Sequence, residues 1–335
     1  MSRNRGGGRV SGSANVNGRG HGRRQHRGGR GSGTDMSSTA MSKTMSFGLS
    51  LVGFGLARQT CRAALNMRRF RAHFGIGPRA IKAMMADMKR YEPSKPIDKT
   101  YLFMAMAWLK LYETEEVMAG RWGYGEQHCR ERVREYVARI RALKNGKISF
   151  DGLSRYCEFL PVDVVHVESQ EFRCTPSSKW WSHKSNGPAV AFEVVTDPVE
   201  GKIRWINGPE PPTTHDITFL RGGKKGKMSQ WKRTSLYFHI PDGVKLVGDS
   251  AYEGQPDKVT TTKDAHNAAT KELFARMKSM QENVFKRFKD FKVLRHSFRH
   301  GSGTDDKLAK IKTAFEAVGV LVEYDIENGH PLFEV

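Results

Sequence analysis

The stretch Lys245-Leu-Val-Gly-Asp-Ser-Ala-Tyr252 decides how the rest of this chain is interpreted. Its apolar and β-branched residues, bounded by Gly248, predict a short buried strand. Asp249 then stands at the carboxyl end of that strand, which is the edge where an α/β sheet presents side chains to a ligand. An isolated Asp in this setting more often caps the following turn. The catalytic interpretation therefore depends on further acids elsewhere in the chain.

Two such acids are Asp163 and Glu282. Asp163 follows the apolar residues 159–162 and precedes the alternating residues 164–167, a pattern typical of a strand. Glu282 lies inside a helical pattern that runs from about Ala265 to Leu294. Carboxylates that converge at one point cannot all stay ionised without a cation, and oxygen-only ligands favour Mg²⁺ or Mn²⁺. Two such ions would activate a water and stabilise the leaving oxygen in attack on a phosphodiester.

The helix around Glu282 leaves two interpretations open. Its apolar face is predicted to consist of Leu273, Met277, Met280, Val284, Phe288 and Phe291. Glu282 lies almost opposite that face, among Lys278, Lys286 and Lys289. Such a stripe is usually a solvated, salt-bridged surface. In the functional interpretation Glu282 completes a metal site where the helix crosses the sheet, and the three lysines hold DNA phosphates.

The charge of the whole chain indicates a polyanionic partner. The 335 residues carry a formal net charge of +21 and are 38% hydrophobic, which allows two folded domains. Nucleic acid is the leading candidate, because a basic bias favours polyanions. The longest weakly polar run, residues 47–57, is too short to span a membrane and has no basic amphipathic face, and the N-terminus shows no secretory signal. We therefore expect a soluble, intracellular protein without a membrane partner.

The cysteine and histidine patterns do not indicate a zinc site or a disulfide framework. The cysteines are scattered and contain no Cys-x-x-Cys pair; they are Cys61, Cys129, Cys157 and Cys174. His296 and His300 have zinc-like spacing, but no cysteine pair or carboxylate is suitably near. A solvated or phosphate-facing pair is the simpler interpretation.

Residues 1–34 differ from the rest in composition. They contain eight arginines interspersed with glycine, and the first acid of the chain is Asp35. Such a segment cannot bury enough apolar surface to offset its ordering entropy, so residues 1–40 are predicted to form a disordered tail. It suits contact with single-stranded nucleic acid, and Arg23 and Arg24 suit nuclear import; a merely solubilising tail is the alternative. Taking these eight arginines from the total of +21 leaves +13, so the folded part is basic in its own right.

Residues 41–150 are predicted to form a helical, DNA-binding domain. Pro78 starts one helix, Asp98 caps a second over Lys99–Leu111, and Thr114 caps a third over 115–121. The third helix would turn Val117, Met118 and Trp122 inward. After the turn at 123–125, another helix begins at Glu126, with Cys129, Val133, Val137 and Ile140 on its apolar side and Gln127, Arg130, Arg134 and Arg141 on the other. This layout is typical of a helix-turn-helix whose second helix enters the major groove, although helical hairpins also occur in proteins that bind no DNA.

Residues 151–335 are predicted to form an α/β domain. Strands are expected at Val162–Glu168, Ala189–Thr196 and Lys202–Asn207, paired in sequence, with Val244–Val247 beside the first. A loop at 213–215 leads into a short helix. Asp216 is there either an N-cap or an accessory acid of the site.

At this point the residues resemble a known family, the PIF/Harbinger-type transposases with their DDE endonuclease domain. The motifs that carry the resemblance are Pro161-Val-Asp-Val-Val-His166, Trp205-Ile-Asn-Gly-Pro209, Thr214-His-Asp216, Val247-Gly-Asp-Ser-Ala-Tyr252 and Gln281-Glu-Asn-Val-Phe-Lys-Arg-Phe-Lys289. Each motif alone is weak, whereas their order over residues 147–335 is specific. The helical region upstream is similar to the family's DNA-binding part.

The resemblance implies a fold, a site and partners. It implies a ribonuclease-H-like mixed sheet with flanking helices, in which Asp163, Asp249 and Glu282 form the catalytic triad and Asp216 is accessory. It further implies cutting of DNA at terminal inverted repeats, strand transfer into a target site and often a Myb-like partner protein. We also expect the protein in the nucleus; a homo-oligomer is an option that the sequence leaves open. Val164 stands where the family commonly has glycine, and a branched residue there either shifts the strand end or is neutral. The alternative function is a transposon-derived nucleic-acid-binding protein that no longer cuts, and a third interpretation makes RNA the target of the tail.

Overall fold

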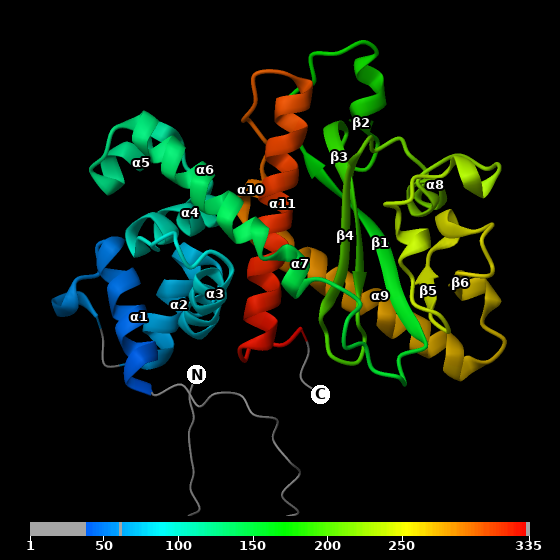
Figure 1. Cartoon of the computed structure of the whole chain (residues 1–335), viewed down its shortest axis with the longest axis horizontal. Helices are drawn as coiled ribbons and strands as arrows, with labels where there is room; N and C mark the ends of the chain where they lie inside the picture. The colour runs from blue at the N-terminus through cyan, green and yellow to red at the C-terminus, as the bar shows by residue number, and fades with distance from the viewer. Residues whose placement is uncertain (1–37, 60–61, 333–335) are drawn as a thin grey trace, which may run out of the picture. The chain divides into compact units, whose positions relative to one another are not determined.

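The helical half of the chain comes first along the sequence. The computed structural model describes residues 38–59 and 62–332, so residues 1–37 of the predicted tail lie outside the described residues, whereas residues 38–40 form the start of a helix. The helices of this half are α1 (Ser38–Leu51), α2 (Ala63–Phe74), α3 (Pro78–Tyr91), α4 (Lys99–Leu111), α5 (Glu115–Trp122), α6 (Glu126–Ala142) and the short α7 (Lys144–Lys147). They are the blue to green helices in Figure 1.

The predicted helix starts are confirmed. Pro78 is the first residue of α3. The Asp98 side chain accepts hydrogen bonds from the amides of Thr100 and Tyr101 at the start of α4, and Thr114 caps α5 through the amide of Val117. The prediction that Val117 turns inward is wrong, because its side chain is 50% exposed. In the short α5 only Met118 is buried, since the helix uses one narrow face against α6.

A six-stranded mixed sheet forms the second half. The strands are β1 (Phe159–Glu168), β2 (Trp181–Ser182), β3 (Gly187–Thr196), β4 (Ile203–Glu210), β5 (Lys245–Gly248) and β6 (Val259–Thr261). β1, β3 and β4 pair antiparallel in sequence, while β5 lies parallel to β1 and β6 parallel to β5. The predicted pairing of the first three strands, with the later strand beside the first, is confirmed. This order is compatible with a ribonuclease-H-like fold.

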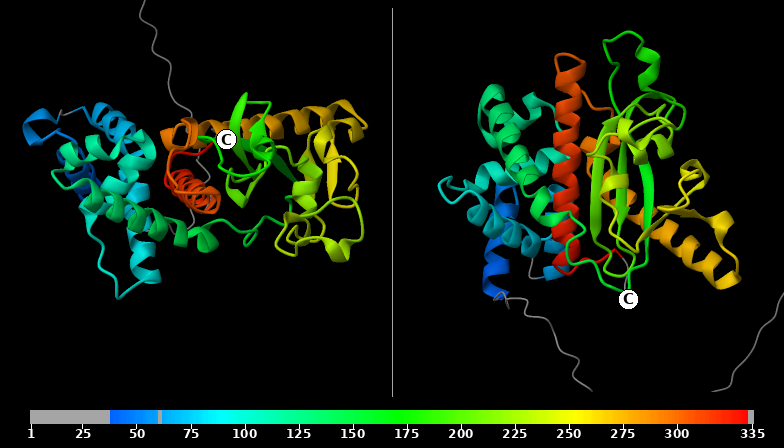
Figure 2. Two further views of the ribbon diagram at one scale, coloured as in Figure 1. Left: turned by 90° about the horizontal axis from the view of Figure 1, so that it is seen from above. Right: turned by 45° about the vertical axis from the view of Figure 1, so that its right-hand side comes forward.

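Helices flank the sheet. α9 (Ala268–Lys289) packs against β1, β3 and β5, and α11 (Thr304–Glu327) packs against β4 on one side and against α3 and α6 on the other. In both views of Figure 2, α11 lies between the N-terminal helices and the strands. The close approach to β4 needs Gly319, because a Cβ there would lie 2.4 Å from Cδ1 of Ile206. α8 (Asp216–Arg221) and α10 (Lys292–Arg295) complete the described α-helices.

One hydrophobic cluster joins the two halves through α11. It runs from Phe70 and Phe103 in the helical half to Phe192 on β3, and the ring of Phe192 stacks on that of Phe315 with centroids 3.9 Å apart. Packing on both sides buries α11 nearly all round over its second half, including the acidic residues Glu316, Glu323 and Asp325. Among the described helices, none is long and apolar enough to cross a lipid bilayer.

The predicted long helix at 265–294 needs correction. α9 starts only at Ala268, where the side chain of Asn267 caps it, and ends at Lys289, so the following residues belong to the separate α10. Leu273, placed on the apolar face, is 42% exposed, and Phe274 is buried in its place. Near the start of α9 the buried side chain is therefore one residue later than predicted, whereas Met277, Val284 and Phe288 are buried as predicted.

Candidate active site

Asp163 and Asp249 come from neighbouring parallel strands. Pro161 on β1 is opposite Val247 on β5, so Asp163 and Asp249, each two residues further, occupy adjacent positions at the carboxyl end of β5. The sheet register therefore places the two acids side by side although 85 residues separate them in the sequence. This is the edge at which parallel strands present ligand-binding groups.

Asp163 is half-buried on β1. Burial raises its pKa, and the nearby Asp249 raises it further, whereas the amide of Val164, which donates to Oδ1 at 2.7 Å, and the charges of Lys184 and Lys278 act in the opposite direction. Within the part of the chain that the structure describes, no hydrogen bond or ion pair engages the second oxygen of Asp163. That oxygen is available to a cation.

Val164 does not displace the strand end. It pairs with Glu193 of β3 in an unbroken register that runs from Val162 to Glu168. Its side chain is 4% exposed and packs in the second hydrophobic cluster, with Leu246 among its members. The contact with Asp163 is made by the backbone amide, which a glycine would supply equally. The branched side chain is therefore accommodated by the core.

Asp249 both caps a turn and stands at the site edge, which are the two roles that the sequence left open. Its Oδ1 accepts a hydrogen bond from the amide of Ala251 at 2.8 Å and so caps the 3₁₀ turn Ser250–Tyr252. The side chain is nevertheless exposed at the strand edge beside Asp163. Gly248, just before it, lies against the Tyr252 ring, because an added Cβ would meet the ring carbon Cδ2 at 2.7 Å. The turn therefore packs tightly behind the carboxylate.

Asp216 joins this pair from α8. The N-cap of α8 is His215, so the alternative that Asp216 caps the helix is wrong. Burial raises the pKa of Asp216 to about 6; Lys184 opposes this increase, and Asp249 and Asp163 add to it. The structure thus brings Asp163, Asp216 and Asp249 within electrostatic reach of one another, with the Lys184 ammonium as a nearby counter-charge.

Glu282 is not drawn into this cluster. Its side chain is exposed on α9. One turn earlier on the same side of the helix, Lys278 is close enough to Asp163 to influence its pKa. The neighbouring Gln281 is buried and fixes α9 to the sheet, because it accepts a hydrogen bond from the Thr196 hydroxyl at 2.7 Å and donates to the Val194 carbonyl at 2.9 Å. Glu282 therefore lies on a fixed helix near the acid pair, without contacting it.

The donor set suits a divalent cation in chemistry but is not closed around one. Carboxylate oxygens are the ligands that Mg²⁺ and Mn²⁺ prefer, and their mutual repulsion at this edge would be relieved by a cation. Over residues 38–59 and 62–332, however, no group of three or more His, Cys, Asp or Glu side chains is close enough to hold a metal ion. Binding would require the carboxylates to draw together.

Sequence reasoning missed two polar groups behind the site. Glu193 on β3 is fully buried beside Asp216, and burial raises its pKa well above the ordinary value. Neither of its carboxyl oxygens receives a hydrogen bond of normal geometry from the residues that the structure describes, although the Trp205 indole lies near enough to lower the pKa somewhat. The buried Tyr252 hydroxyl likewise has no partner in the described part of the chain and lies near these acids. The sequence does contain a signal for the buried Glu193, because it is the one charged residue inside the apolar run 189–196.

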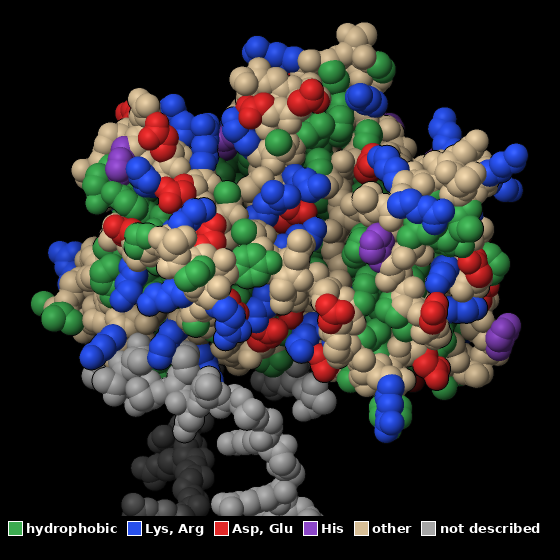
Figure 3. Space-filling view, viewed as in Figure 1, with side chains coloured by type: hydrophobic (Ala, Val, Ile, Leu, Met, Phe, Trp, Pro, Cys, Tyr) green, Lys and Arg blue, Asp and Glu red, His purple; other side chains and the backbone are tan. Residues whose placement is uncertain are grey.

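Basic side chains surround the acids. Burial lowers the pKa of His166 on β1 to about 4, and the charges of the nearby Lys184 and Lys289 contribute to this decrease. A loop after α8 adds exposed cations that the sequence analysis did not single out, namely Lys224, Lys225, Lys227, Lys232 and Arg233. Arg221 ties this loop to the segment after Asp249, because its Nε donates to the Gln255 side chain at 2.9 Å. Figure 3 shows Lys and Arg side chains gathered over the surface around α8.

The predicted recognition helix is α6, and most of its polar side chains already have partners. Arg130 forms a bidentate ion pair with Glu115 of α5, and Gln127 donates to Glu131. Arg141 pairs with Glu316 of α11. Arg134 is exposed and lines a pocket between α6 and α11. The two helices and the turn at 123–125 are present as predicted, but DNA recognition by α6 stays a prediction.

A comparison with known protein families identifies a similarity over the segment that contains the acids. Residues 162–322 match the family model described as DDE superfamily endonuclease, a segment that contains all four predicted acids. No curated protein and no solved structure matches the chain. The match supports the DDE superfamily for this segment, and endonucleases of that superfamily generally act on DNA with divalent metal ions. It does not distinguish the PIF/Harbinger type.

Proposed function

We propose that the chain is a transposase of the PIF/Harbinger type that cuts DNA at the ends of its own element and transfers the cut strands to a target site. The observation that carries this proposal is the register that sets Asp163 beside Asp249 at the carboxyl end of β5, inside the segment similar to DDE superfamily endonucleases. The proposed catalytic acids are Asp163, Asp249 and Glu282, with Asp216 accessory.

Each part of the site has a distinct task in this proposal. Asp163, Asp249 and Glu282 would hold two divalent cations, Mg²⁺ or Mn²⁺, which when bound would supply an activated nucleophile and charge stabilisation at the leaving oxygen. Asp216, whose pKa lies near 6, would orient a water or a further cation at the edge of the pair. Lys278, Lys286 and Lys289 on α9, with Lys184, would fix the DNA phosphates against the acids.

The remaining parts of the proposal concern recognition and context. Gln127, Arg130 and Arg134 of α6 would read the element ends in the major groove. The Arg/Gly-rich segment would add sequence-independent affinity and direct the protein to the nucleus. A Myb-like partner and self-association would assemble the two ends.

The experiment that tests the function uses purified full-length protein and duplex DNA carrying the element's own terminal repeats. Incubation with Mg²⁺ should yield cleaved ends, and incubation with a chelator should yield none. End binding without cleavage under both conditions would favour the second candidate, a transposon-derived DNA-binding protein. The acid cluster, which is not closed around a cation among the described residues, gives that candidate its specific support.

A further inference from the structure

A pocket outside the proposed active site lies where α4, α5 and α6 meet α11. Its volume is about 270 Å³. The floor is apolar and consists mainly of the side chains of Met118, Val133, Val137, Phe298 and Ala314, all of them buried. Exposed alanines, Ala138 of α6 and Ala309 of α11, line the same pocket, so it opens to solvent between the two helices.

His300 stands in this pocket among aromatic rings. Its ring centroid lies 5.2 Å from that of Trp108, 5.5 Å from that of Tyr112 and 5.7 Å from that of Phe298. The Nε2 atom is buried and has no hydrogen-bond partner among the described residues. Burial, with the neighbouring Arg299, lowers the pKa of His300 to about 4, so the ring is neutral at physiological pH. A buried ring nitrogen without a partner is a site for a polar group of an occupant.

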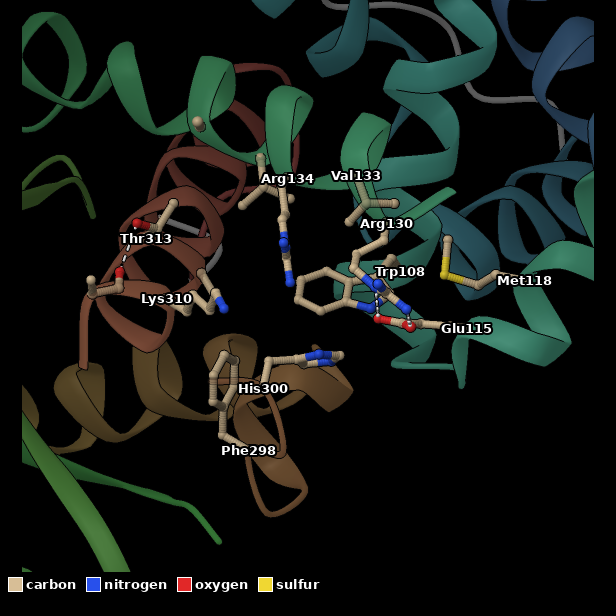
Figure 4. A pocket seen from close by; sticks show the side chains of 14 residues that line it. Trp108, Glu115, Met118, Arg130, Val133, Arg134, Phe298, His300, Lys310 and Thr313 are labelled. Atoms are coloured by element: carbon tan, nitrogen blue, oxygen red, sulfur yellow. Dashed lines mark hydrogen bonds and ion pairs between the residues drawn. The ribbon is translucent and has the colours of Figure 1, made fainter. Parts of the chain in front are cut away.

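Among the charged residues around the pocket, one cationic side chain has no ion-pair partner in the described structure. The Arg130 guanidinium is taken up by Glu115, and Lys310 pairs with Asp306 at 2.6 Å. Arg134 makes no hydrogen bond or ion pair with any described residue, and it points from α6 into the pocket between Lys310 and Trp108 (Figure 4). A guanidinium with all its donors free binds a carboxylate in bidentate fashion.

Size and chemistry together select the occupant. The pocket is smaller than the roughly 300–1,000 Å³ of typical sites for small molecules and cofactors, but it can hold one large side chain. Its floor offers contacts to an apolar group and the His300 Nε2 atom offers one polar contact, while the free guanidinium of Arg134 attracts an anion. The opening between two helices is the setting in which amphipathic segments dock.

We infer that this pocket is a docking site for an acidic segment of a partner protein, which inserts one bulky apolar side chain and presents a carboxylate to Arg134. Charge complementarity favours such a partner, because the chain carries a net charge of +21. Duplex DNA fits this pocket less well, because its phosphate backbone carries no bulky apolar group that would fill the floor. The inference is independent of cleavage and assigns Arg134 a partner other than a base edge.

The test starts from an unbiased selection. A random peptide library is screened on immobilised full-length protein, and the strongest binder is labelled for fluorescence anisotropy. Enriched peptides should combine a bulky apolar residue with a neighbouring Asp or Glu. A selection that yields no binder, or only basic peptides, would overturn the inference.

Variants locate the binding site. Arg134→Ala should weaken peptide affinity about tenfold, the value expected for a charged hydrogen bond. Arg132→Ala is the matched control on the same helix, because Arg132 pairs with Glu135 and does not line the pocket. Ala309→Trp should fill the opening and abolish binding, and since Ala309 is exposed this change leaves the core intact. Unchanged affinity in both pocket variants would place the peptide elsewhere and reject the site.

Two competitors distinguish other occupants. Random duplex DNA should not displace the peptide from the wild type; displacement that is lost in Arg134→Ala would make the pocket a DNA contact. Indole-3-acetate should not compete at concentrations near the peptide's Kd. Tight competition by this free acid would show a small-molecule site and reject the partner segment.

Discussion

Asp163 on β1 and Asp249, the first residue after β5, each stand two residues beyond the paired Pro161 and Val247 of these parallel strands. This relationship depends on the backbone register alone and not on side-chain conformation. Two carboxylates fixed in this way repel each other, and burial of Asp163 strengthens the repulsion because the surroundings screen it less. A cation would relieve this conflict.

The first prediction concerns Asp249. Asp249→Asn should abolish metal-dependent cleavage and leave DNA binding intact, because it removes a ligand charge with almost no change in shape. Asp242→Asn is the matched control: it removes the same charge in the loop before β5, at the other end of that strand. Cleavage assays and end-binding assays on both variants give the answer. An Asp249→Asn protein that cuts at the wild-type rate would refute the triad.

The second prediction concerns the third carboxylate. If Glu282 is a ligand, Glu282→Gln should lower the cleavage rate at least about a hundredfold, equivalent to about 2.7 kcal/mol, and Asp216→Asn should cost less. Glu272→Gln tests the loss of charge on the same helix, where Glu272 pairs only with Arg276 in the described structure. The reverse order of the two effects would assign the third position to Asp216, which the structure places nearer to the pair.

The sheet could be predicted from the sequence because its signals are local. Alternation along β1 and β3 and the short apolar run of β5 mark the strands, and the end of β5 fixes the place of Asp249. The long segment between β1 and β3, which brings Lys184 to the acids, has no such periodicity. Its position depends on contacts that only the folded chain provides.

The face presented by a helix was harder to predict than the helix itself. The helical periodicity of α6 predicts a polar face that contains Arg130 and Arg141. It cannot show that Glu115 and Glu316, from other helices, form ion pairs with these two arginines. Glu282 is a similar case. The helical period predicts that it lies on the same side of α9 as Lys278, but it does not give the distance between α9 and β1. Tertiary contacts therefore decide which polar faces remain open to a ligand.

The third prediction concerns stability and pH. Glu323 of α11 is fully buried and accepts a hydrogen bond from the Ile203 amide at 2.7 Å, and burial raises its pKa to about 8. The folded state thus holds a proton that the unfolded chain releases near pH 4.3. The contribution of Glu323 to stability is fully present below about pH 4.3 and is lost as the pH rises toward about 8, by at most about 1.4 kcal/mol per unit.

Chemical denaturation at several pH values from about 5 to about 8 measures this dependence. Glu323→Gln should flatten it, because the amide carries no titrating proton. Glu116→Gln, an exposed change in α5, should leave the slope as in the wild type. An equal slope in the wild type and in Glu323→Gln would mean that Glu323 is ionised in the folded protein.

The fourth prediction concerns α6. If this helix reads the element ends, replacing Arg130 and Arg134 with alanine should lower affinity for the specific end sequence more than for random DNA. Arg130→Ala also leaves Glu115 without its ion-pair partner. The Arg134→Ala single variant therefore measures the contribution of one α6 side chain to DNA affinity without this side effect. Equal losses on both DNAs would reduce α6 to phosphate contact. No loss on either would agree with Arg134 serving the docking pocket.

The fifth prediction separates charge from recognition in the N-terminal segment. Deleting residues 1–34 removes eight arginines, which should bind phosphates and exposed base faces and should carry little sequence information. Affinity for any DNA should fall, and the slope of log affinity against log salt should become shallower by about 0.9 for each duplex phosphate that the protein no longer neutralises. The preference for specific over random ends should stay the same. An unaltered salt slope would leave nuclear import or RNA binding as the role of the segment, whereas a weaker end preference would place part of the readout there and not in α6.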